Sequence, residues 1–248
     1  MTGTHLLRSP ALWVWLVFAA LLFGMPALEP LFSHIFPGIR PAVFDRDSFV
    51  ALWLSHAWLV LLSSAASAVL GIGLAVFVTR PAGRDFRAIV NALATIGQTF
   101  PPAAVLALAV PAVGFGPRPT VIALFLYGLL PIIENSIAGL AGVPSAILEA
   151  AEGMGLSAAQ RLRRVELPLA APLVLAGLRL SVTIGIGTAT IGSTVGALTL
   201  GTPIFDGLIG NKLPFVLQGA VLIALFAIAT DLTFAEAEGR LRTRPGQG

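Results

Sequence analysis

Six long apolar stretches alternate with short polar segments along the chain. They cover about 12–28, 49–78, 89–113, 119–133, 173–195 and 215–234. A helix of about 20 apolar residues is long enough to cross the hydrocarbon layer of a bilayer. The pattern therefore predicts an all-α integral membrane protein with about six transmembrane helices and with both termini on one side of the membrane.

Three of these stretches carry features that change the simple picture. The first follows Arg8 and lacks a convincing small-x-small cleavage site before Glu29, so we expect an uncleaved anchor rather than a signal peptide. The stretch 49–78 is long enough to tilt or to begin as an interfacial helix. In the third stretch Pro101-Pro102 removes two amide donors, which predicts a kink or a break.

The composition independently indicates a membrane protein. Of the 248 residues 56% are hydrophobic and 11% are charged, and the mean hydropathy is +0.92. Soluble domains are about 25% charged. A soluble fold could not bury so much apolar surface, so we expect one integral membrane domain.

The basic residues predict the orientation of that domain. One set of polar segments holds Arg8, Arg80, Arg84, Arg87, Arg161, Arg163, Arg164, Arg240, Arg242 and Arg244, and the other set holds Arg40, Arg46, Arg118 and Lys212. Segments rich in arginine stay in the cytoplasm. The N- and C-termini and the loop around 144–168 are therefore expected to be cytoplasmic.

Several chemical functions find no support in the sequence. The chain has no cysteine, and its three histidines are scattered, so neither a metal site nor a catalytic residue is predicted. The basic residues flank apolar segments instead of forming one basic face, which argues against a nucleic-acid partner. There is no phosphate-binding loop of the G-x4-G-K-[ST] type, and Gly185-Ile186-Gly187 lies inside an apolar stretch. We therefore expect no cofactor and no ATP hydrolysis by this chain.

The polar segment 144–168 has the signals of two short helices joined at a bend. Ser145 is expected to cap a first helix that runs through Ala151. Gly153 and Gly155 permit backbone conformations that other residues resist. These residues predict a helix followed by a turn.

The second helix of this segment has a start and a stop signal. Ser157 and Gln160 have the spacing of a capping box. Pro168 is expected to end the helix before the chain re-enters the membrane. The alternative for the whole segment is an ordinary amphipathic surface loop.

The same segment resembles the EAA loop of ABC importer permeases, which has the pattern E-A-A-x3-G-x9-I-x-L-P. The matching positions are Glu149, Ala150, Ala151, Gly155, Val165, Leu167 and Pro168. Val165 stands where that family prefers isoleucine, an exchange of similar volume. The resemblance implies that these residues dock the chain on a cytoplasmic ATPase.

A wider stretch, about 95–231, is similar to the osmoprotectant permeases, the group that imports glycine betaine, carnitine and choline. The resemblance rests on the segment 127–140 (YGLLPIIENSIAGL), on 166–170 (ELPLA), on 176–179 (AGLR) and on 187–190 (GTAT). The chain departs from that group at Glu134, where arginine is usual, and at Leu198-Thr199, where two glycines are usual. Before residue 95 only the general pattern of spans supports the assignment.

The resemblance implies a type I (MetI-like) ABC importer permease fold in the bacterial inner membrane. It implies an N-terminal helix and external loop over 1–48, a permease domain over 49–235 that contains the loop 144–168, and a cytoplasmic tail over 236–248. The implied partners are cytoplasmic ATPase subunits, a second permease subunit in a homo- or heterodimer, a periplasmic or lipid-anchored substrate-binding protein, and membrane lipid. The implied function is import of an osmoprotectant, such as glycine betaine or choline.

Few polar residues lie within the apolar stretches. Asn91 and Gln98 share a helical face and could hydrogen-bond to another helix or line a translocation path. Thr188 and Gly192 belong to a row of small residues, for which helix packing and path lining are both open. His56 is expected at the outer membrane interface.

Two other functions compete with the osmoprotectant permease. An ABC permease for another small solute, such as an amino acid or an oxyanion, shares the loop motif. An ion-coupled secondary transporter needs intramembrane charges, for which Asp231 alone is thin support. A membrane enzyme has less support still, because His, Asp and Glu do not cluster.

Overall fold

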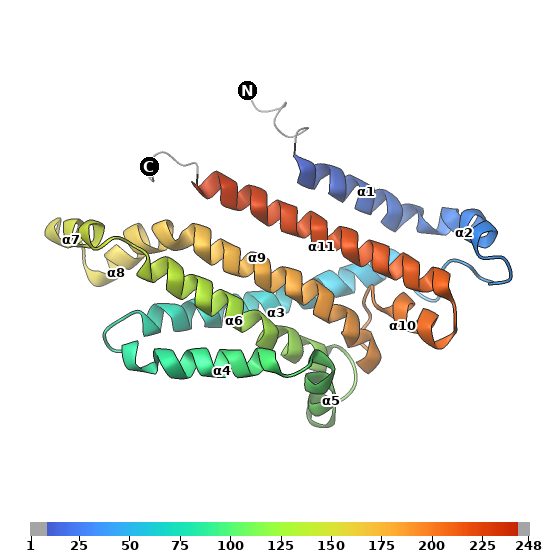
Figure 1. The fold of residues 1–248 in the computed structure, drawn as a ribbon, viewed down its shortest axis with the longest axis horizontal. Coiled ribbons are helices and arrows are strands. Elements are labelled where there is room, and N and C mark those ends of the chain that lie inside the picture. Colours follow the sequence, from blue (N-terminus) through green and yellow to red (C-terminus); the bar gives the residue numbers. More distant parts are fainter. Residues whose placement is uncertain (1–8, 243–248) are drawn as a thin grey trace. The chain divides into compact units, whose positions relative to one another are not determined.

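The computed structural model describes residues 9–242, which form helices and, within that range, no strand (Figure 1). In chain order the elements are α1 (Pro10–Gly24), the 3-10 helix η2 (Met25–Leu28), α2 (Glu29–Ile35), α3 (Phe49–Val78), the 3-10 helix η3 (Arg84–Phe86), α4 (Arg87–Thr99), α5 (Pro102–Val113), α6 (Pro117–Ala141), α7 (Ser145–Gly153), α8 (Ala158–Arg161), the π turn η4 (Leu162–Glu166), α9 (Leu167–Ile191), the 3-10 helix η5 (Gly192–Val195), α10 (Thr202–Ile209) and α11 (Leu213–Arg242).

The predicted spans correspond to these helices. Among the described residues five helices are long and apolar enough to cross a membrane, and the pair α4 and α5 would make a sixth span. α3 has the predicted bounds, and its 30 residues give a length of about 45 Å, more than a bilayer core requires. The helix α10, which lies between the predicted stretches 173–195 and 215–234, was not predicted.

The predicted break at Pro101-Pro102 is present. α4 ends at Thr99 with Phe100 in extended backbone (φ −72°, ψ 137°), and α5 begins at Pro102. The two helices are bent by 95°. Proline at the first position of a helix needs no amide hydrogen, so the pair ends one helix and starts the next.

The chain divides into two compact units, which are described separately. Unit 1 comprises 1–63, 101–124 and 183–233, and unit 2 comprises 64–100, 125–182 and 234–248. The helices α3, α6, α9 and α11 each contribute a segment to both units.

Unit 1 has an aromatic core and two buried polar side chains that bind the backbone. Phe18 stacks on Phe226 with ring centroids 5.8 Å apart. The Gln218 amide accepts a hydrogen bond from Phe44 N (3.0 Å) and donates one to Ala42 O (2.8 Å), which fixes the segment before α3 to α11. Gln218 therefore satisfies two backbone groups that would otherwise be buried without a partner.

The surroundings of His56 were not predicted, and its expected position at the outer membrane interface remains a prediction. The residue is fully buried in unit 1, where Leu200 N donates to Nδ1 (3.3 Å) and Nε2 lies 3.1 Å from Ile186 O. The first bond assigns the proton to Nε2, which donates to Ile186 O. Two backbone partners allow this histidine to be buried, and no sequence pattern indicated them.

Unit 2 brings its helices close together at small residues. A Cβ at Gly177 would lie 2.8 Å from Pro131 O, and a Cβ at Gly139 would lie 3.1 Å from both Ala170 Cβ and Ala170 O. Such contacts let the backbones of α6 and α9 approach closely. The apolar core beside them contains Ala75, Val78, Ala94, Ile133, Ile137, Leu140 and Ala170.

Candidate functional site

The segment 144–168 lies in unit 2 and folds into α7, α8 and the π turn, between the end of α6 and the start of α9 (Figure 1). The two predicted short helices are therefore confirmed. Ser145 does not cap the first one, because it is already the first helical residue. Pro144 is the N-cap, without a side-chain hydrogen bond, and its carbonyl accepts from Ile147 N (3.1 Å).

The bend after α7 depends on Gly155. Its φ is +78°, in the left-handed region. Gly155 N donates to Glu152 O (2.8 Å), and Leu156 N donates to Ala151 O (3.1 Å). This pair of bonds is the Schellman motif, which satisfies the last carbonyls of a helix and favours glycine at the left-handed position. The left-handed backbone conformation at this position thus explains why the EAA pattern has a glycine there.

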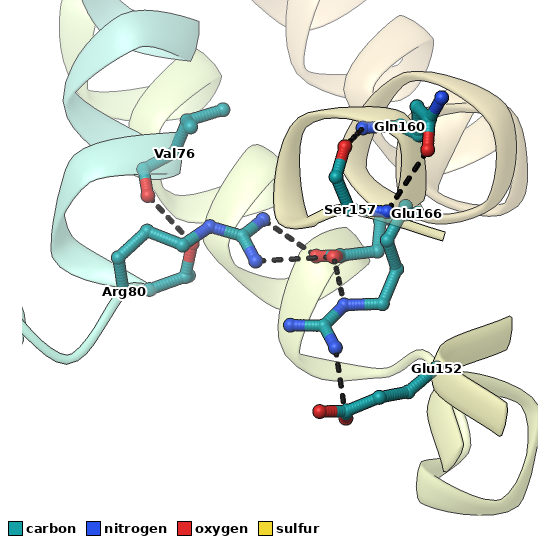
Figure 2. Close-up of polar contacts among 8 residues, drawn as sticks. Val76, Arg80, Glu152, Ser157, Gln160 and Glu166 are labelled. Atoms are coloured by element: carbon teal, nitrogen blue, oxygen red, sulfur yellow. Dashed lines mark hydrogen bonds and ion pairs between the residues drawn. The ribbon is translucent and has the colours of Figure 1, made fainter. Parts of the chain in front are cut away.

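The predicted capping box starts α8. Gln160 N donates to Ser157 Oγ (3.3 Å), and Ser157 N donates to Gln160 Oε1 (2.9 Å) (Figure 2). The two bonds satisfy donors that a helix start leaves without an intrahelical partner. The chain direction after the bend is therefore fixed by side chains as well as by the glycine.

Pro168 does not end the second helix, as the sequence suggested. α8 passes through the π turn Leu162–Glu166 into α9, and Pro168 is the second residue of α9. Leu167 N bonds to Leu162 O, five residues back. In a π turn the backbone hydrogen bonds run five residues back instead of four. Where the four-residue pattern resumes, one amide has no acceptor in the helix, so a proline, which has no amide hydrogen, is tolerated there. The helix therefore continues.

The residues of the EAA pattern differ in exposure. Glu149, Ala150, Gly155 and Pro168 are exposed, Val165 and Leu167 are half-buried, and Ala151 is buried. The exposed residues are available to a partner, whereas Ala151 packs inside unit 2.

An apolar face accompanies the exposed alanine of the pattern. Ile147 is 40% exposed and Met154 is 73% exposed. With Ala150 they follow the spacing i, i+3, i+7, so Ile147 and Ala150 of α7 and Met154, its C-cap residue, lie on one side. Ile147 and Met154 were not predicted as candidate residues, although their spacing in the sequence could have revealed them.

Glu166 is the centre of a charge network in this loop. Its side chain is only 4% exposed. Arg80 Nη1 donates to Oε1 (3.1 Å) and Arg80 Nη2 donates to Oε2 (2.5 Å). Arg161 Nε lies 3.4 Å from Oε1, and Arg161 Nη1 donates to Glu152 Oε2 (3.1 Å). Figure 2 shows Glu166 between Arg80 on one side and Glu152 on the other.

This network was not predicted, and only the number of arginines in the loop pointed to it. Arg80 is 86 residues from Glu166 in the chain, so no local pattern relates them. The two carboxylates of Glu166 and Glu152 balance the charges of Arg80 and Arg161. The bidentate geometry makes the Arg80 pair the stronger of the two contacts of Glu166.

The candidate path residues fall into both units. In unit 2, Gln98 Nε2 donates to Tyr127 O (2.7 Å), and Asn91 is half-buried on the same helix. In unit 1, Thr188 is buried, and a Cβ at Gly192 would lie 2.6 Å from Thr120 Oγ1. Gln98 and Gly192 thus have helix-to-helix contacts, and a role for the four residues in the path remains a prediction.

Two positions where the sequence departs from the osmoprotectant permeases have different surroundings. Glu134 is exposed on α6 and forms no ion pair among residues 9–242. Thr199 is buried, its Oγ1 lies 2.7 Å from Ser193 Oγ, and it accepts a hydrogen bond from Gly201 N (3.0 Å). The hydroxyl therefore holds the turn before α10.

Residues 67–243 match the family model described as binding-protein-dependent transport system inner membrane component. The chain belongs to this family. It is a transport subunit that acts with a separate ATPase subunit and a substrate-binding protein, and it is not itself the enzyme. The match confirms the predicted resemblance of this permease to ABC importer permeases. It excludes an ion-coupled secondary transporter and a membrane enzyme as the function of the chain.

Curated relatives resemble the permease over most of its length. The osmoprotectant import permease protein OsmY of Salmonella typhimurium is 42% identical over 180 residues, which are 73% of this chain and 76% of the relative. The choline transport system permease protein OpuBD of Bacillus subtilis is 38% identical over 218 residues, 88% of this chain and 92% of the relative.

Solved structures confirm the predicted fold. An inward-facing structure of the MetNI methionine ABC transporter has a TM-score of 0.70 with 22% sequence identity, over 79% of this chain and 96% of that chain. At this identity the likeness shows the fold alone. The permease thus has the type I importer fold that the resemblance implied.

Proposed function

We propose that this permease forms the translocation path for a quaternary ammonium osmoprotectant, such as glycine betaine or choline. The observation that carries the proposal is the similarity to the osmoprotectant permease OsmY at 42% identity. Choline permease OpuBB of Bacillus subtilis, 37% identical over 75% of this chain, supports the same substrate class. Because all these solutes carry a trimethylammonium group, one path chemistry could serve them.

The loop 144–168 is the proposed docking site for the ATPase. The proposed docking residues are Glu149, Ala150, Ala151, Gly155, Val165, Leu167 and Pro168, with Ile147 and Met154 added from the structure. Because Ala151 is buried, its proposed part is to support α7 from inside unit 2. The apolar side of α7 suits a groove on a protein partner, since exposed apolar residues rimmed by charge are typical of interaction sites. The Schellman turn holds this side in one orientation.

The orientation proposed from the arginines has support from the two units. The described part of unit 2 contains Arg80, Arg84, Arg87, Arg161, Arg163, Arg164, Arg179, Arg240 and Arg242, whereas the described part of unit 1 contains Arg40, Arg46, Arg118 and Lys212. Arginine-rich segments favour the cytoplasm, so the docking loop and the C-terminus, which both belong to unit 2, are proposed to be cytoplasmic. The N-terminus is proposed to lie on the same side because six spans separate it from the C-terminus. Arg8 and Arg244 lie outside the described residues.

A second permease subunit, identical or similar, is proposed to complete the path, and an external binding protein to deliver the solute. Asn91, Gln98, Thr188 and Gly192 are the candidate path residues. When the ATPases close on ATP they move the two docking loops, and the helices that these loops join change the accessible side of the path. The segment 49–235 is the proposed permease domain, flanked by 1–48 and the tail 236–248.

The test is uptake by the reconstituted transporter. The permease is co-expressed with its ATPase and binding protein, placed in liposomes with internal ATP, and given radiolabelled choline, glycine betaine, carnitine or methionine. Uptake of at least one quaternary ammonium compound, and none of methionine, is expected. Uptake of methionine alone would overturn the substrate class, and uptake without ATP would overturn the mechanism.

A further inference from the structure

The buried carboxylate of Glu166 requires an explanation beyond docking. It lies in the π turn, on the inner side of the loop, where a partner cannot reach it. A charge removed from water is tolerated only where other charges and hydrogen bonds replace the water. The arrangement around Glu166 therefore shows which parts of unit 2 it holds together.

The first part is the end of α3. Arg80 follows α3 by two residues, and its amide donates to Phe77 O (3.1 Å), so its backbone extends the last turn of that helix. Gly83 N donates to Arg80 O (3.0 Å), which closes the following turn. The guanidinium that clamps both oxygens of Glu166 is thus attached to a compact helix end.

The second part is the docking helix α7. Arg161 belongs to α8, and it contacts Glu166 through Nε and Glu152 of α7 through Nη1. The side chain of Arg161 is 23% exposed and that of Glu152 is 73% exposed, so this link is weaker than the Arg80 pair. A continuous chain of opposite charges thus runs from Arg80, just after α3, through Glu166 and Arg161 to Glu152 of α7. Figure 2 labels Arg80, Glu166 and Glu152 of this chain.

The π turn gives Glu166 its place in this chain. A π turn contains one more residue than an α turn, and one residue corresponds to about 100° of rotation in a helix of 3.6 residues per turn. The extra residue therefore changes the direction of the loop relative to α9. Glu166, at the end of the turn, is fixed to the start of α9 by the backbone and to α3 and α8 by charge.

We propose that Glu166 is the positioning residue that joins the docking loop to α3, so that a displacement of α7 moves α3 and α9 together. This inference rests on the proposed docking of an ATPase at the loop. Without the joint, α7 would follow the ATPase while α3 stayed behind, and ATP hydrolysis would continue with less transport.

Because the chain contains no cysteine, two introduced cysteines can carry labels that report the distance between α7 and α3. Ser145→Cys on α7 and Val69→Cys on α3 are exposed positions of the same unit for two nitroxide labels. The full transporter with its ATPase, in lipid nanodiscs, is measured by electron-electron double resonance without nucleotide and with ATP and vanadate. We expect the same label distance in both states for the otherwise unchanged chain.

Glu166→Gln keeps the size of the side chain and removes its charge. In this variant the label distance should differ between the two states or broaden, and transport per ATP hydrolysed should fall by about 2- to 30-fold, the range for residues within a coupling network. Arg80→Gln should have the same effect, and the double variant should be no worse than Glu166→Gln, because both changes break one contact. Arg84→Gln, an exposed arginine after α3, is the matched control and should change neither quantity.

If Glu166→Gln fails to assemble with the ATPase, a second variant keeps the proposal testable. Arg161→Gln keeps the Arg80 pair and breaks only the link to α7, so it should also uncouple the two labels. Unchanged distances and unchanged transport per ATP in Glu166→Gln, or in Arg161→Gln if that is the variant that assembles, would overturn the proposal. So would a label distance that already changes in the unaltered chain. Failure of the ATPase to co-purify with the unaltered permease would instead overturn the docking role itself.

Discussion

Replacing Gly155 perturbs the docking loop through its backbone alone. The residue has φ +78°, and a Cβ built on it meets no atom within 4 Å. A side chain would therefore not clash with its surroundings. Its cost is the strain of a left-handed conformation, about 1–2 kcal/mol for most residues and less for asparagine.

This strain sets the size of the expected effect. A penalty of about 1–2 kcal/mol lowers the population of the observed turn about 5- to 30-fold relative to other turns, since about 1.4 kcal/mol is a factor of ten. Gly155→Val should show most of this loss, because a β-branched residue is poorly tolerated there. Gly155→Asn should show little. Membrane insertion should be unchanged, because the turn lies outside the spans.

The assay is substrate-stimulated ATP hydrolysis and uptake in proteoliposomes, with the amount of inserted permease measured by immunoblot. Gly153→Ala is the matched control, because Gly153 is helical and a Cβ there also meets nothing within 4 Å. Equal losses in the Gly155→Asn and Gly155→Val variants would refute the backbone argument. Loss of insertion in Gly155→Val would show that the turn serves folding rather than coupling.

Three further predictions concern packing, orientation and affinity. Gly177→Ala places a Cβ 2.8 Å from Pro131 O and should destabilise the protein by about 1–3 kcal/mol, which a lower melting temperature in detergent would show. Gly187→Ala, whose Cβ would meet no atom within 4 Å, should leave the melting temperature unchanged. A reporter fused after Arg163 should be cytoplasmic and one after Lys212 external, and the reverse result would contradict the proposed topology. The purified permease alone should bind choline, glycine betaine and carnitine weakly in calorimetry, and micromolar affinity would reveal a built-in site.

The spans were predictable because they depend on composition and length. The bounds of α3 and the break at Pro101-Pro102 follow from local rules, as do the bend at Gly155 and the capping box at Ser157. In each case the cause lies within a few residues of the effect. The family followed from the spacing of the loop residues.

Two kinds of feature were not predicted. Pro168 continues a helix because a π turn, for which the sequence has no known signal, directly precedes it. His56 is buried because Ile186 and Leu200, far away in the chain, supply partners. The contact of Glu166 with Arg80 joins two helix ends that are far apart in the chain. No local pattern relates residues so far apart, so the sequence could name the proposed docking residues but not the contacts that hold their loop in place.

The central claim, that the loop 144–168 docks the permease on its ATPase, has a direct test in cross-linking. Met154→Cys supplies a single cysteine on the exposed side of α7, and a benzophenone label attached to it is photoactivated in the assembled transporter. The account predicts a covalent product with the ATPase subunit, and none from the same label at Val69→Cys on the exposed side of α3. A product with the ATPase from Val69 and none from Met154 would contradict it.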